Sequence, residues 1–288
     1  MQYGTSLDWA YETEPEPGCA DRRIAQPRGR VLGGCSAMNG MFWIKGSNLD
    51  YDGWRLPGWS WDDVAPVFAR IEQGPMHITR SPFPDELSHR FVASARAAGV
   101  AANDDVSGPD LDGAAITPVN IHKGQRWSTA RGYLRHQNNL TTVTKASVHR
   151  VIIRNGRAVG IEYRRRGCVQ QAFADHEVVV STGAFGTPHL LQLSGIGPAA
   201  HLRRVGVTPL VDSPRVGQGL SDHPMTWAVW SLAPGYVGLA DVANPKWLLQ
   251  WLLRRTGKLT SNGGEALAHI RSTFRRPGMR HSADLHPR

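Results

Sequence analysis

A glycine-rich stretch near the N-terminus constrains the fold of this chain more than any other feature. Its sequence, from residue 28 to residue 40, is RGRVLGGCSAMNG, and its glycines are Gly29, Gly33, Gly34 and Gly40. Glycine has no Cβ, so its backbone N–H groups can approach an anionic or planar ligand closely. The serine and asparagine between the glycines can add short hydrogen bonds. From the residues alone, the stretch is either an ordinary structural loop or a cradle for a ligand.

Helix signals dominate the part of the chain that follows. Ser60 followed by Asp63 resembles a capping box, which predicts a helix over residues 61–72. A second helix is expected over residues 86–98, because a glycine that suits a helix C-terminus comes next. The acidic, turn-rich stretch 103–113 is expected to be a surface loop.

Strand signals begin near residue 140. The dipeptide Asn155-Gly156 lies between two stretches of strand-like pattern and predicts a β-hairpin. Three consecutive valines, 178–180, predict a strand buried on both faces. A helix is expected next, with Thr187 as its N-cap, Pro188 at its first position and Gly195 at its end. Helices and strands together predict a mixed α/β fold.

Composition excludes several classes of protein. Hydrophobic residues make up 41% of the 288 residues and charged residues 20%, which is typical of a globular chain. The sequence has no apolar run of about 18 residues, so no transmembrane segment is expected. The three cysteines are too scattered for a disulfide framework or a four-ligand zinc site, and a cytoplasmic location is therefore expected. No metal-binding motif or Walker A sequence is present either.

The net charge of +9 is unevenly distributed. Residues 1–120 contain 10 Lys and Arg against 16 Asp and Glu, whereas residues 121–288 contain 23 against 8. Such asymmetry can indicate a nucleic-acid or acidic-membrane partner. No nucleic-acid-binding motif accompanies the basic residues, so we expect solvated surface arginines and no nucleic-acid partner.

Two motifs resemble signatures of the glucose–methanol–choline (GMC) family of FAD-dependent oxidoreductases. Residues 29–39 are similar to the family pattern G-R-x-L-G-G-x-S-x-x-N, and residues 183–197 (GAFGTPHLLQLSGIG) to G-A-x-x-[ST]-P-x-L-L-x-x-S-G-[IV]-G. The strings DWAYETEP and VGQGLSDHP also resemble choline-dehydrogenase-like and alcohol-dehydrogenase-like members. The resemblance implies part of a doubly wound FAD-binding domain together with part of an antiparallel-sheet substrate domain.

The resemblance also implies a division of the chain into four segments. Residues 1–60 would form a region of loops that contacts FAD, and residues 61–140 a helical and loop region on the substrate side. Residues 141–224 would supply strands and helices of the FAD-binding domain. Residues 225–288 would begin the substrate domain.

Site residues follow from the same resemblance. The implied FAD-binding residues are Arg30, Gly33, Gly34, Ser36, Asn39, Gly40, Val148, Ser181, Gly183 and Ala184. Among these, Val148 matches the position at the adenine end, and residues 181–184 match the turn near the ADP part. Members with covalently attached FAD carry a histidine immediately before the motif's asparagine, where this chain has Met38, so noncovalent FAD is expected. Glu265 matches a carboxylate of the substrate cavity, although a solvated glutamate after a glycine turn is an equal alternative.

The implied reaction is oxidation of a primary alcohol, either choline-like or aliphatic or aromatic, by hydride transfer to flavin N5. The family's catalytic histidine falls beyond the C-terminus of this chain, so no residue here is assigned a catalytic role; His281 and His286 lack the family context. Because family members extend beyond both ends, the chain is expected to be incomplete at both ends and inactive by itself. The alternatives are a hydroxynitrile lyase of the same family, a non-catalytic remnant and a basic binding module. The alcohol, the electron acceptor and the oligomeric state stay open.

Overall fold

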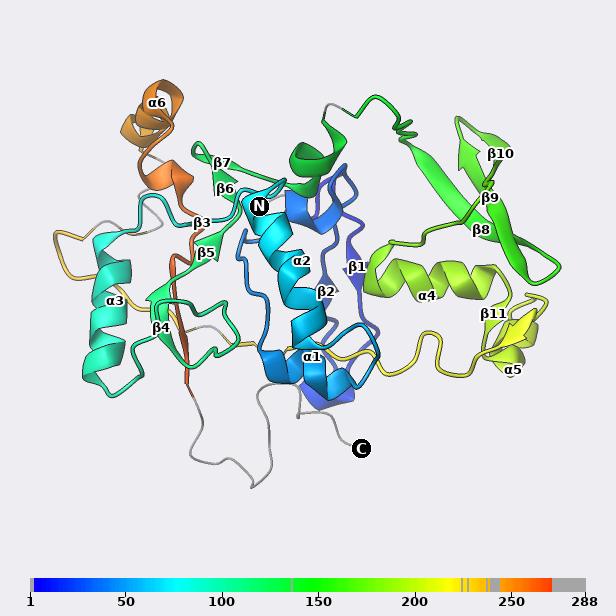
Figure 1. The fold of residues 1–288 in the computed structure, drawn as a ribbon, viewed down its shortest axis with the longest axis horizontal. Helices are drawn as coiled ribbons and strands as arrows, with labels where there is room; N and C mark the ends of the chain where they lie inside the picture. Colours follow the sequence, from blue (N-terminus) through cyan, green and yellow to red (C-terminus); the bar gives the residue numbers. More distant parts are fainter. Residues whose placement is uncertain are drawn as a thin grey trace. The chain divides into compact units, whose positions relative to one another are not determined.

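The computed structural model describes residues 3–135, 137–223, 225–226, 228–236, 238 and 244–270. The chain divides into two compact units, which we call unit 1 (residues 1–138 and 231–288) and unit 2 (residues 139–230). Helices and short strands occur in both units, which confirms the expected mixed α/β class (Figure 1). The four-segment division stays a prediction.

The helices of unit 1 begin where the sequence places capping residues. They are α1 (Asn48–Trp54), α2 (Trp61–Gln73), α3 (Glu86–Ala97) and α6 (Pro245–Arg254), with short turns η1 (Pro17–Cys19), η2 (Gly34–Ala37), η3 (Ala130–Leu134) and η5 (Lys258–Thr260). The Ser60 side chain accepts a hydrogen bond from the backbone of Asp63, whose carboxylate accepts one in return from the backbone of Ser60. This capping box fixes the start of α2 as expected. The second expected helix is α3, and Gly99 follows it with φ +91°.

Short antiparallel pairs form the strands of unit 1. The strands are β1 (Tyr11–Glu12), β2 (Ala25–Gln26), β3 (Thr79–Arg80), β4 (Gly113–Ile116), β5 (Pro118–Val119), β6 (Ile121–His122), β7 (Gln125–Arg126) and β13 (Ala266–His269). The pairs are β1 with β2, β3 with β5, β6 with β7, and β4 with β13. Buried side chains from β4 to β6, such as Val119 and Ile121, supply much of its apolar core.

The acidic loop before β4 is not wholly at the surface, contrary to expectation. Val106 and Ser107 are buried, with 0% and 1% of their surface exposed. Local side-chain hydrogen bonds turn the backbone inward at this point, because Asn103 accepts from the Asp105 N–H and Asp105 accepts from the Ser107 N–H. The polar residues of this loop therefore shape a turn that carries its apolar residue into the core.

Unit 2 is built on a three-stranded antiparallel sheet. Its strands are β8 (Ala146–Arg154), β9 (Arg157–Arg165) and β10 (Cys168–Phe173), in the order β10-β9-β8. The turn residues Asn155 and Gly156 have φ of +50° and +75°, so the expected hairpin is confirmed. Helix α4 (Gly183–Leu193) packs against β8. A parallel pair, β11 (Ile196–Gly197) with β12 (Val211–Asp212), and helix α5 (Ala199–Arg204) complete the unit.

Two local predictions in unit 2 are wrong. Residues 178–180 form no strand, and Val179 is 75% exposed. A strand needs a neighbour that pairs with its backbone, and no described strand pairs with these valines. Helix α4 begins at Gly183 rather than after Thr187, so Pro188 lies inside it. The two glycines of GAFG are poor helix formers, so the sequence gives no sign of a helix there. In the structure GAFG nevertheless forms the first turn of α4, which packs against β8.

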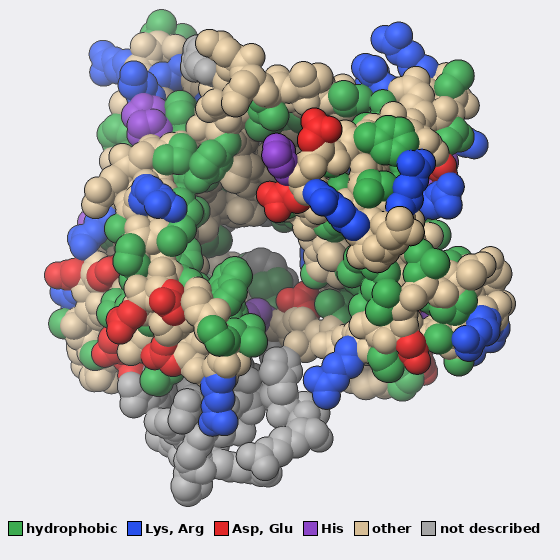
Figure 2. Space-filling model, turned by 45° about the vertical axis from the view of Figure 1, so that its right-hand side comes forward, with side chains coloured by type: hydrophobic (Ala, Val, Ile, Leu, Met, Phe, Trp, Pro, Cys, Tyr) green, Lys and Arg blue, Asp and Glu red, His purple; other side chains and the backbone are tan. Residues whose placement is uncertain are grey.

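Large hydrophobic side chains remain exposed in both units. Examples are Leu253 on α6, which is 73% exposed, and Trp230 at the end of unit 2, which is 79% exposed. Figure 2 shows hydrophobic side chains spread among polar and charged ones on one face of the molecule. Large apolar side chains therefore lie at the surface of both units as well as in their cores.

Candidate functional site

The glycine-rich loop of unit 1 is held in one conformation by its glycines. Gly33 and Gly34 have φ of +90° and +53°, a region that other residues adopt at a free-energy penalty, and they lead into η2. A Cβ on Gly29 would lie 2.3 Å from the carbonyl oxygen of Gly34. Any other residue at position 29 would therefore force the backbone at Gly34 to move away. By contrast, apart from its chain neighbours and the backbone of its own turn, no described atom lies within 4 Å of the position that a Cβ on Gly34 would take. One side of the loop is therefore tightly packed and another side is open.

Ser36 fastens this loop to a segment far away in the sequence. Its hydroxyl donates to the carbonyl oxygen of Gly33 at 2.6 Å and accepts from the backbone N–H of Thr129 at 3.0 Å. The Thr129 hydroxyl also donates to the Gly33 carbonyl at 3.2 Å. The Ser36 side chain is thus engaged within the protein, and its contact with FAD stays a prediction.

Asn39 is held by a second distant residue, Arg126 at the end of β7. The Oδ1 atom of Asn39 accepts from Arg126 Nη1 at 2.9 Å and from the backbone N–H of Met41 at 3.1 Å. The same Arg126 nitrogen donates to the backbone carbonyl of Ser36 at 3.2 Å. Desolvation lowers the pKa of Arg126, and a weaker interaction with Tyr3 opposes this. Sequence reasoning missed both Arg126 and Thr129, because they lie about 90 residues from the loop that they hold.

The remaining predicted residues of the loop lie around this centre. Arg30 is exposed and its guanidinium group stacks over the ring of Trp9 at 4.8 Å. The Gly40 carbonyl accepts from Asn262 Nδ2 at 2.9 Å, which ties the end of the loop to the segment before β13. Met38 is 6% exposed and fills the interior, as expected of an apolar residue.

Glu265 is buried rather than solvated, so the alternative of a surface glutamate is wrong. It is 8% exposed, and its Oε2 atom accepts from the backbone N–H of Asp85 at 2.5 Å and from the Ser88 hydroxyl at 2.9 Å. Both donors lie at the N-terminus of α3, where a negative charge is stabilised. An ion pair between Lys258 and Asp85 lies beside it. Its role toward a substrate stays a prediction.

The predicted residues of unit 2 gather at two places. Val148 lies in β8, immediately before a bulge in the pairing with β9. Ser181, Gly183 and Ala184 are exposed at the start of α4. Thr182, at the N-cap of α4, makes no side-chain capping bond. The first residues of this helix are thus exposed, and helix N-termini commonly attract anionic groups.

Comparison with known proteins decides the family. The family model described as GMC oxidoreductase matches residues 11–225, which is well over half of the chain. The chain belongs to the GMC oxidoreductase family. Its similarity to GMC proteins therefore includes both motifs, the sheet of unit 2 and helices α1 to α5.

Several relatives and solved structures resemble this GMC chain. It is 37% identical to an oxygen-dependent choline dehydrogenase from Sinorhizobium fredii, over 95% of this chain and 53% of the relative. An uncharacterized GMC-type oxidoreductase from Mycobacterium tuberculosis is 39% identical, over 94% and 55%. Formate oxidase resembles it with a TM-score of 0.81 at 27% identity, over 91% of this chain and 51% of that one. A formate oxidase variant from Aspergillus oryzae, described for its effect on FAD modification, has the same TM-score of 0.81 and 27% identity, with the same 91% and 51% coverage. The chain thus spans about half the length of the relatives it matches.

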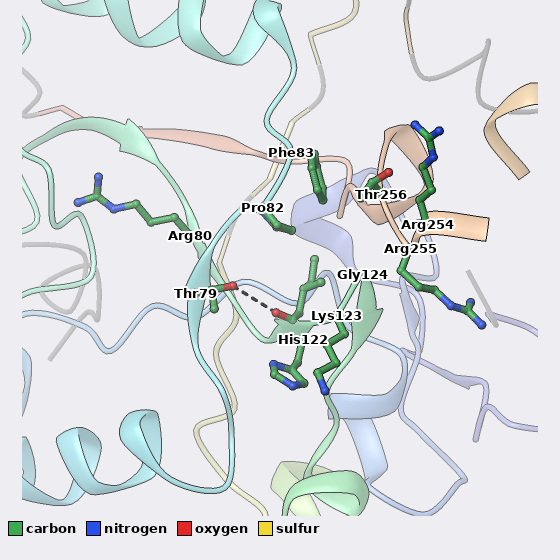
Figure 3. Close-up of a pocket in the computed structure, with 11 residues that line it drawn as sticks. Thr79, Arg80, Pro82, Phe83, His122, Lys123, Gly124, Arg254, Arg255 and Thr256 are labelled. Carbon is green, nitrogen blue, oxygen red and sulfur yellow. Dashed lines mark hydrogen bonds between the residues drawn. The ribbon is translucent and has the colours of Figure 1, made fainter. Parts of the chain in front are cut away.

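A cavity of about 510 Å³ lies elsewhere in unit 1 of the GMC chain, between β3, the turn from β6 to β7 and the end of α6. Its four cationic residues are Arg80, Lys123, Arg254 and Arg255. Figure 3 shows their charged ends pointing away from the centre of the cavity, where Pro82 and Phe83 lie. The polar groups therefore do not converge on one ligand position, and none of the predicted site residues lines this cavity.

His122 lines the same cavity and packs within an aromatic cluster. Its ring stacks on His77 with 4.2 Å between ring centroids, and Trp127 meets both rings edge-on. Desolvation lowers the pKa of His122 from its ordinary value of 6.5, and the neighbouring His77 and Lys123 add to this shift. The neutral form of His122 is therefore favoured in the fold.

Three further observations bear on cofactors and location. Within the described residues, no group of three or more His, Cys, Asp or Glu side chains could hold a metal ion. All three cysteines are free. Among the helices that the structure describes, none is both long and apolar enough to cross a membrane.

Proposed function

We propose that the protein carrying this segment is an FAD-dependent oxidoreductase that acts on CH–OH groups and oxidises a primary alcohol. The observation that carries the proposal is the glycine-rich loop, which is fixed by Ser36, Thr129 and Arg126 and left open beside Gly34. Such a fixed backbone with an open side suits a planar or anionic ligand. The names of the relatives, choline dehydrogenase and formate oxidase, support a flavin-linked oxidation.

The residues present fit FAD in chemical kind. FAD combines a planar ring that carries hydrogen-bond acceptors with an anionic pyrophosphate. In unit 1, the open side of Gly34 and the exposed amide of Asn39 would hold the flavin part. In unit 2, Gly183 and Ala184, exposed at the start of α4, are the candidates for the pyrophosphate or ADP part. When bound, FAD would supply the hydride acceptor for alcohol oxidation.

Attachment of FAD is proposed to be noncovalent. Covalent attachment in this family uses a histidine at the position that Met38 occupies, and a buried thioether has no ring nitrogen to form that bond. Acid precipitation of the flavin-loaded protein should release all yellow colour into the supernatant. Flavin that stays with the pellet would contradict this part of the proposal.

The substrate is proposed to be a small alcohol, and Glu265 is the candidate for attracting a cationic one such as choline. The Glu265→Gln variant keeps an acceptor for Asp85 N–H and Ser88 but removes the charge. We expect it to weaken transition-state binding of a cationic alcohol by roughly 1–3 kcal/mol, seen as a higher KM, while a neutral alcohol of similar size is little affected. Equal effects on both alcohols would assign Glu265 to the support of α3 alone.

The function is tested in a protein of the relatives' full length. To make a hybrid, this chain would replace the matching segment of a choline dehydrogenase relative, which it matches over 95% of its length. Flavin content and alcohol-dependent dye reduction would be measured. The expected result is one flavin per chain, reduced by a primary alcohol. Flavin that binds but is not reduced by any alcohol, together with release of cyanide from a hydroxynitrile, would favour the lyase alternative.

The isolated chain is expected to behave differently from that hybrid. We propose that residues 1–288 alone bind FAD weakly and do not oxidise alcohols, since the relatives supply roughly as many residues again. Titration of the purified chain with FAD, followed by flavin fluorescence and dye reduction with a panel of primary alcohols, tests this. Stoichiometric binding with turnover would overturn it.

A further inference from the structure

We propose that Arg126 is a positioning residue: it holds the amide of Asn39 so that the N–H₂ group, and not the oxygen, faces the ligand of the glycine-rich loop. The identity of that ligand as FAD rests on the proposed function. The position of Arg126 does not rest on it, because all the contacts concerned lie within unit 1.

The orientation of the Asn39 amide follows from its two partners. Both Arg126 Nη1, at 2.9 Å, and the Met41 backbone nitrogen, at 3.1 Å, are donors. An amide nitrogen cannot accept a hydrogen bond, so the atom that meets both donors is the oxygen. Rotation of the amide by half a turn would place N–H groups against N–H groups. The Nδ2 atom has no protein partner among the described residues and belongs to an exposed side chain.

Arg126 is suited to this task by geometry and by charge. Its Nη1 atom carries two hydrogens and meets two acceptors, Asn39 Oδ1 and the Ser36 carbonyl, so it joins both sides of the turn that ends η2. No carboxylate among the described residues forms an ion pair with it. Its positive charge therefore acts on the Asn39 oxygen, which draws electron density from the amide and strengthens the N–H₂ group as a donor.

A chemical restriction on the ligand follows. The group that meets Asn39 must be a hydrogen-bond acceptor, such as a ring carbonyl oxygen, a ring nitrogen without hydrogen or a phosphate oxygen. A donor group of the ligand would meet a donor of the protein. Asn39 thus favours a ligand with an acceptor group at this position, and Arg126 sets this preference because it fixes the orientation of the Asn39 amide.

The test substitutes Asn39 in two ways, with the melting temperature measured on the chain itself and the FAD affinity measured on the hybrid with the choline dehydrogenase relative. Asn39→Asp keeps an oxygen toward Arg126 and Met41 but replaces the outward N–H₂ with a second oxygen. We expect its melting temperature to equal or exceed that of the unchanged chain, because Arg126 gains an ion-pair partner, while its affinity for FAD falls at least tenfold. Asn39→Ala should lower both the melting temperature and the affinity.

Substitution of the arginine completes the experiment. Arg126→Met keeps a long side chain but removes the charge and both hydrogen bonds of Nη1. We expect it to lower the melting temperature and to abolish the gain from Asn39→Asp in the double variant. Arg80→Met is the matched control, since Arg80 is an exposed arginine of unit 1 that bonds the Asp104 carbonyl, and it should leave both measurements unchanged.

Each outcome decides one part of the inference. If Asn39→Asp loses as much stability as Asn39→Ala, Arg126 does not face residue 39 and the inference is overturned. If Asn39→Asp does not lower the affinity for FAD, the N–H₂ group of Asn39 does not donate to FAD. If the hybrid with the unchanged sequence shows no binding up to millimolar FAD, the proposed function fails and the donor half of the inference falls with it. The melting temperatures of the chain still decide the position of Arg126.

Discussion

The two sequence motifs of this GMC chain are held in place by different kinds of contact. The glycine-rich loop of unit 1 is fixed by residues about 90 positions away, above all by the side chain of Arg126 and by the backbone and side chain of Thr129. The second motif, residues 183–197 of unit 2, forms most of its hydrogen bonds inside α4 and in the turn after it. Its long-range side-chain bonds are from the Val151 N–H to Ser194 Oγ at 2.8 Å, which joins α4 to β8, and from Gln192 Nε2 to the Val216 carbonyl at 3.0 Å.

The two motifs differ because one forms a helix and the other an irregular loop. A helix makes its own backbone hydrogen bonds, so its shape depends little on what surrounds it. An irregular loop has no such internal ladder, and its backbone groups must find partners elsewhere. The loop therefore keeps one conformation only when the hairpin of β6 and β7 has formed. We expect substitutions in distant segments to disturb the loop more than they disturb the second motif.

The largest effect is expected from Gly29→Ala. The new Cβ would lie 2.3 Å from the Gly34 oxygen, so the loop must open, at a loss of about 3 kcal/mol in the free energy of unfolding. Gly183→Ala in the second motif is the comparison, because the space around Gly183 is open and only its φ of +80° is strained, which should amount to about 1 kcal/mol. Chemical denaturation measures both, and equal losses would contradict the contrast between the motifs.

Ser194→Ala should have the second-largest effect, because Ser194 is the residue through which the second motif bonds to β8. Ser194 is 5% exposed, and its loss leaves the buried N–H of Val151 without an acceptor, which is expected to reduce the free energy of unfolding by about 1–3 kcal/mol. Ser147→Ala, on an exposed position of the same strand, serves as control. A loss below that of the control would mean that water replaces the hydroxyl.

Thr129→Val should have a smaller effect on stability and a distinct effect on the loop. Valine keeps the shape of the side chain but removes the hydrogen bond to the Gly33 carbonyl, so we expect a loss of about 0.5–1.5 kcal/mol. Thr187→Val, which removes an exposed hydroxyl contact with Thr182 in the second motif, should change less. Proteolysis of the loop should also become faster in Thr129→Val alone, and unchanged cleavage would argue against long-range fastening.

The smallest effect concerns pH and the hairpin that carries Arg126. The pKa of His122 is lowered in the fold, mainly by desolvation, from an ordinary value of 6.5. The unfolded chain therefore takes up the proton first as the pH falls, and stability decreases as the pH drops below 6.5 toward the folded-state pKa. His122→Gln should flatten the dependence of the melting temperature on pH in that window. An unchanged dependence would show that the pKa of His122 is the same in the folded and the unfolded chain.

Much of the local structure could be predicted from the sequence, because its signals are short-range. The capping box of α2, the turn at Asn155-Gly156 and the glycine after α3 each act within a few residues. The conformation of residues 178–180 could not be predicted in this way. A run of valines favours a strand, but a strand forms only where a neighbouring strand pairs with it. The start of α4 was misplaced for a related reason, because packing on β8 outweighs the cap-like pair Thr187-Pro188.

The sequence by itself determined the family, through two motifs in the right order, and with it the residues proposed to meet FAD. It also determined that Met38 stands where covalent members carry histidine. Only the tertiary structure decided what those residues do: Ser36 faces Thr129, Glu265 caps α3, and Asn39 is turned by Arg126. The physical reason is that a motif specifies which backbone groups lack local partners, whereas the partners themselves come from segments that meet only after folding.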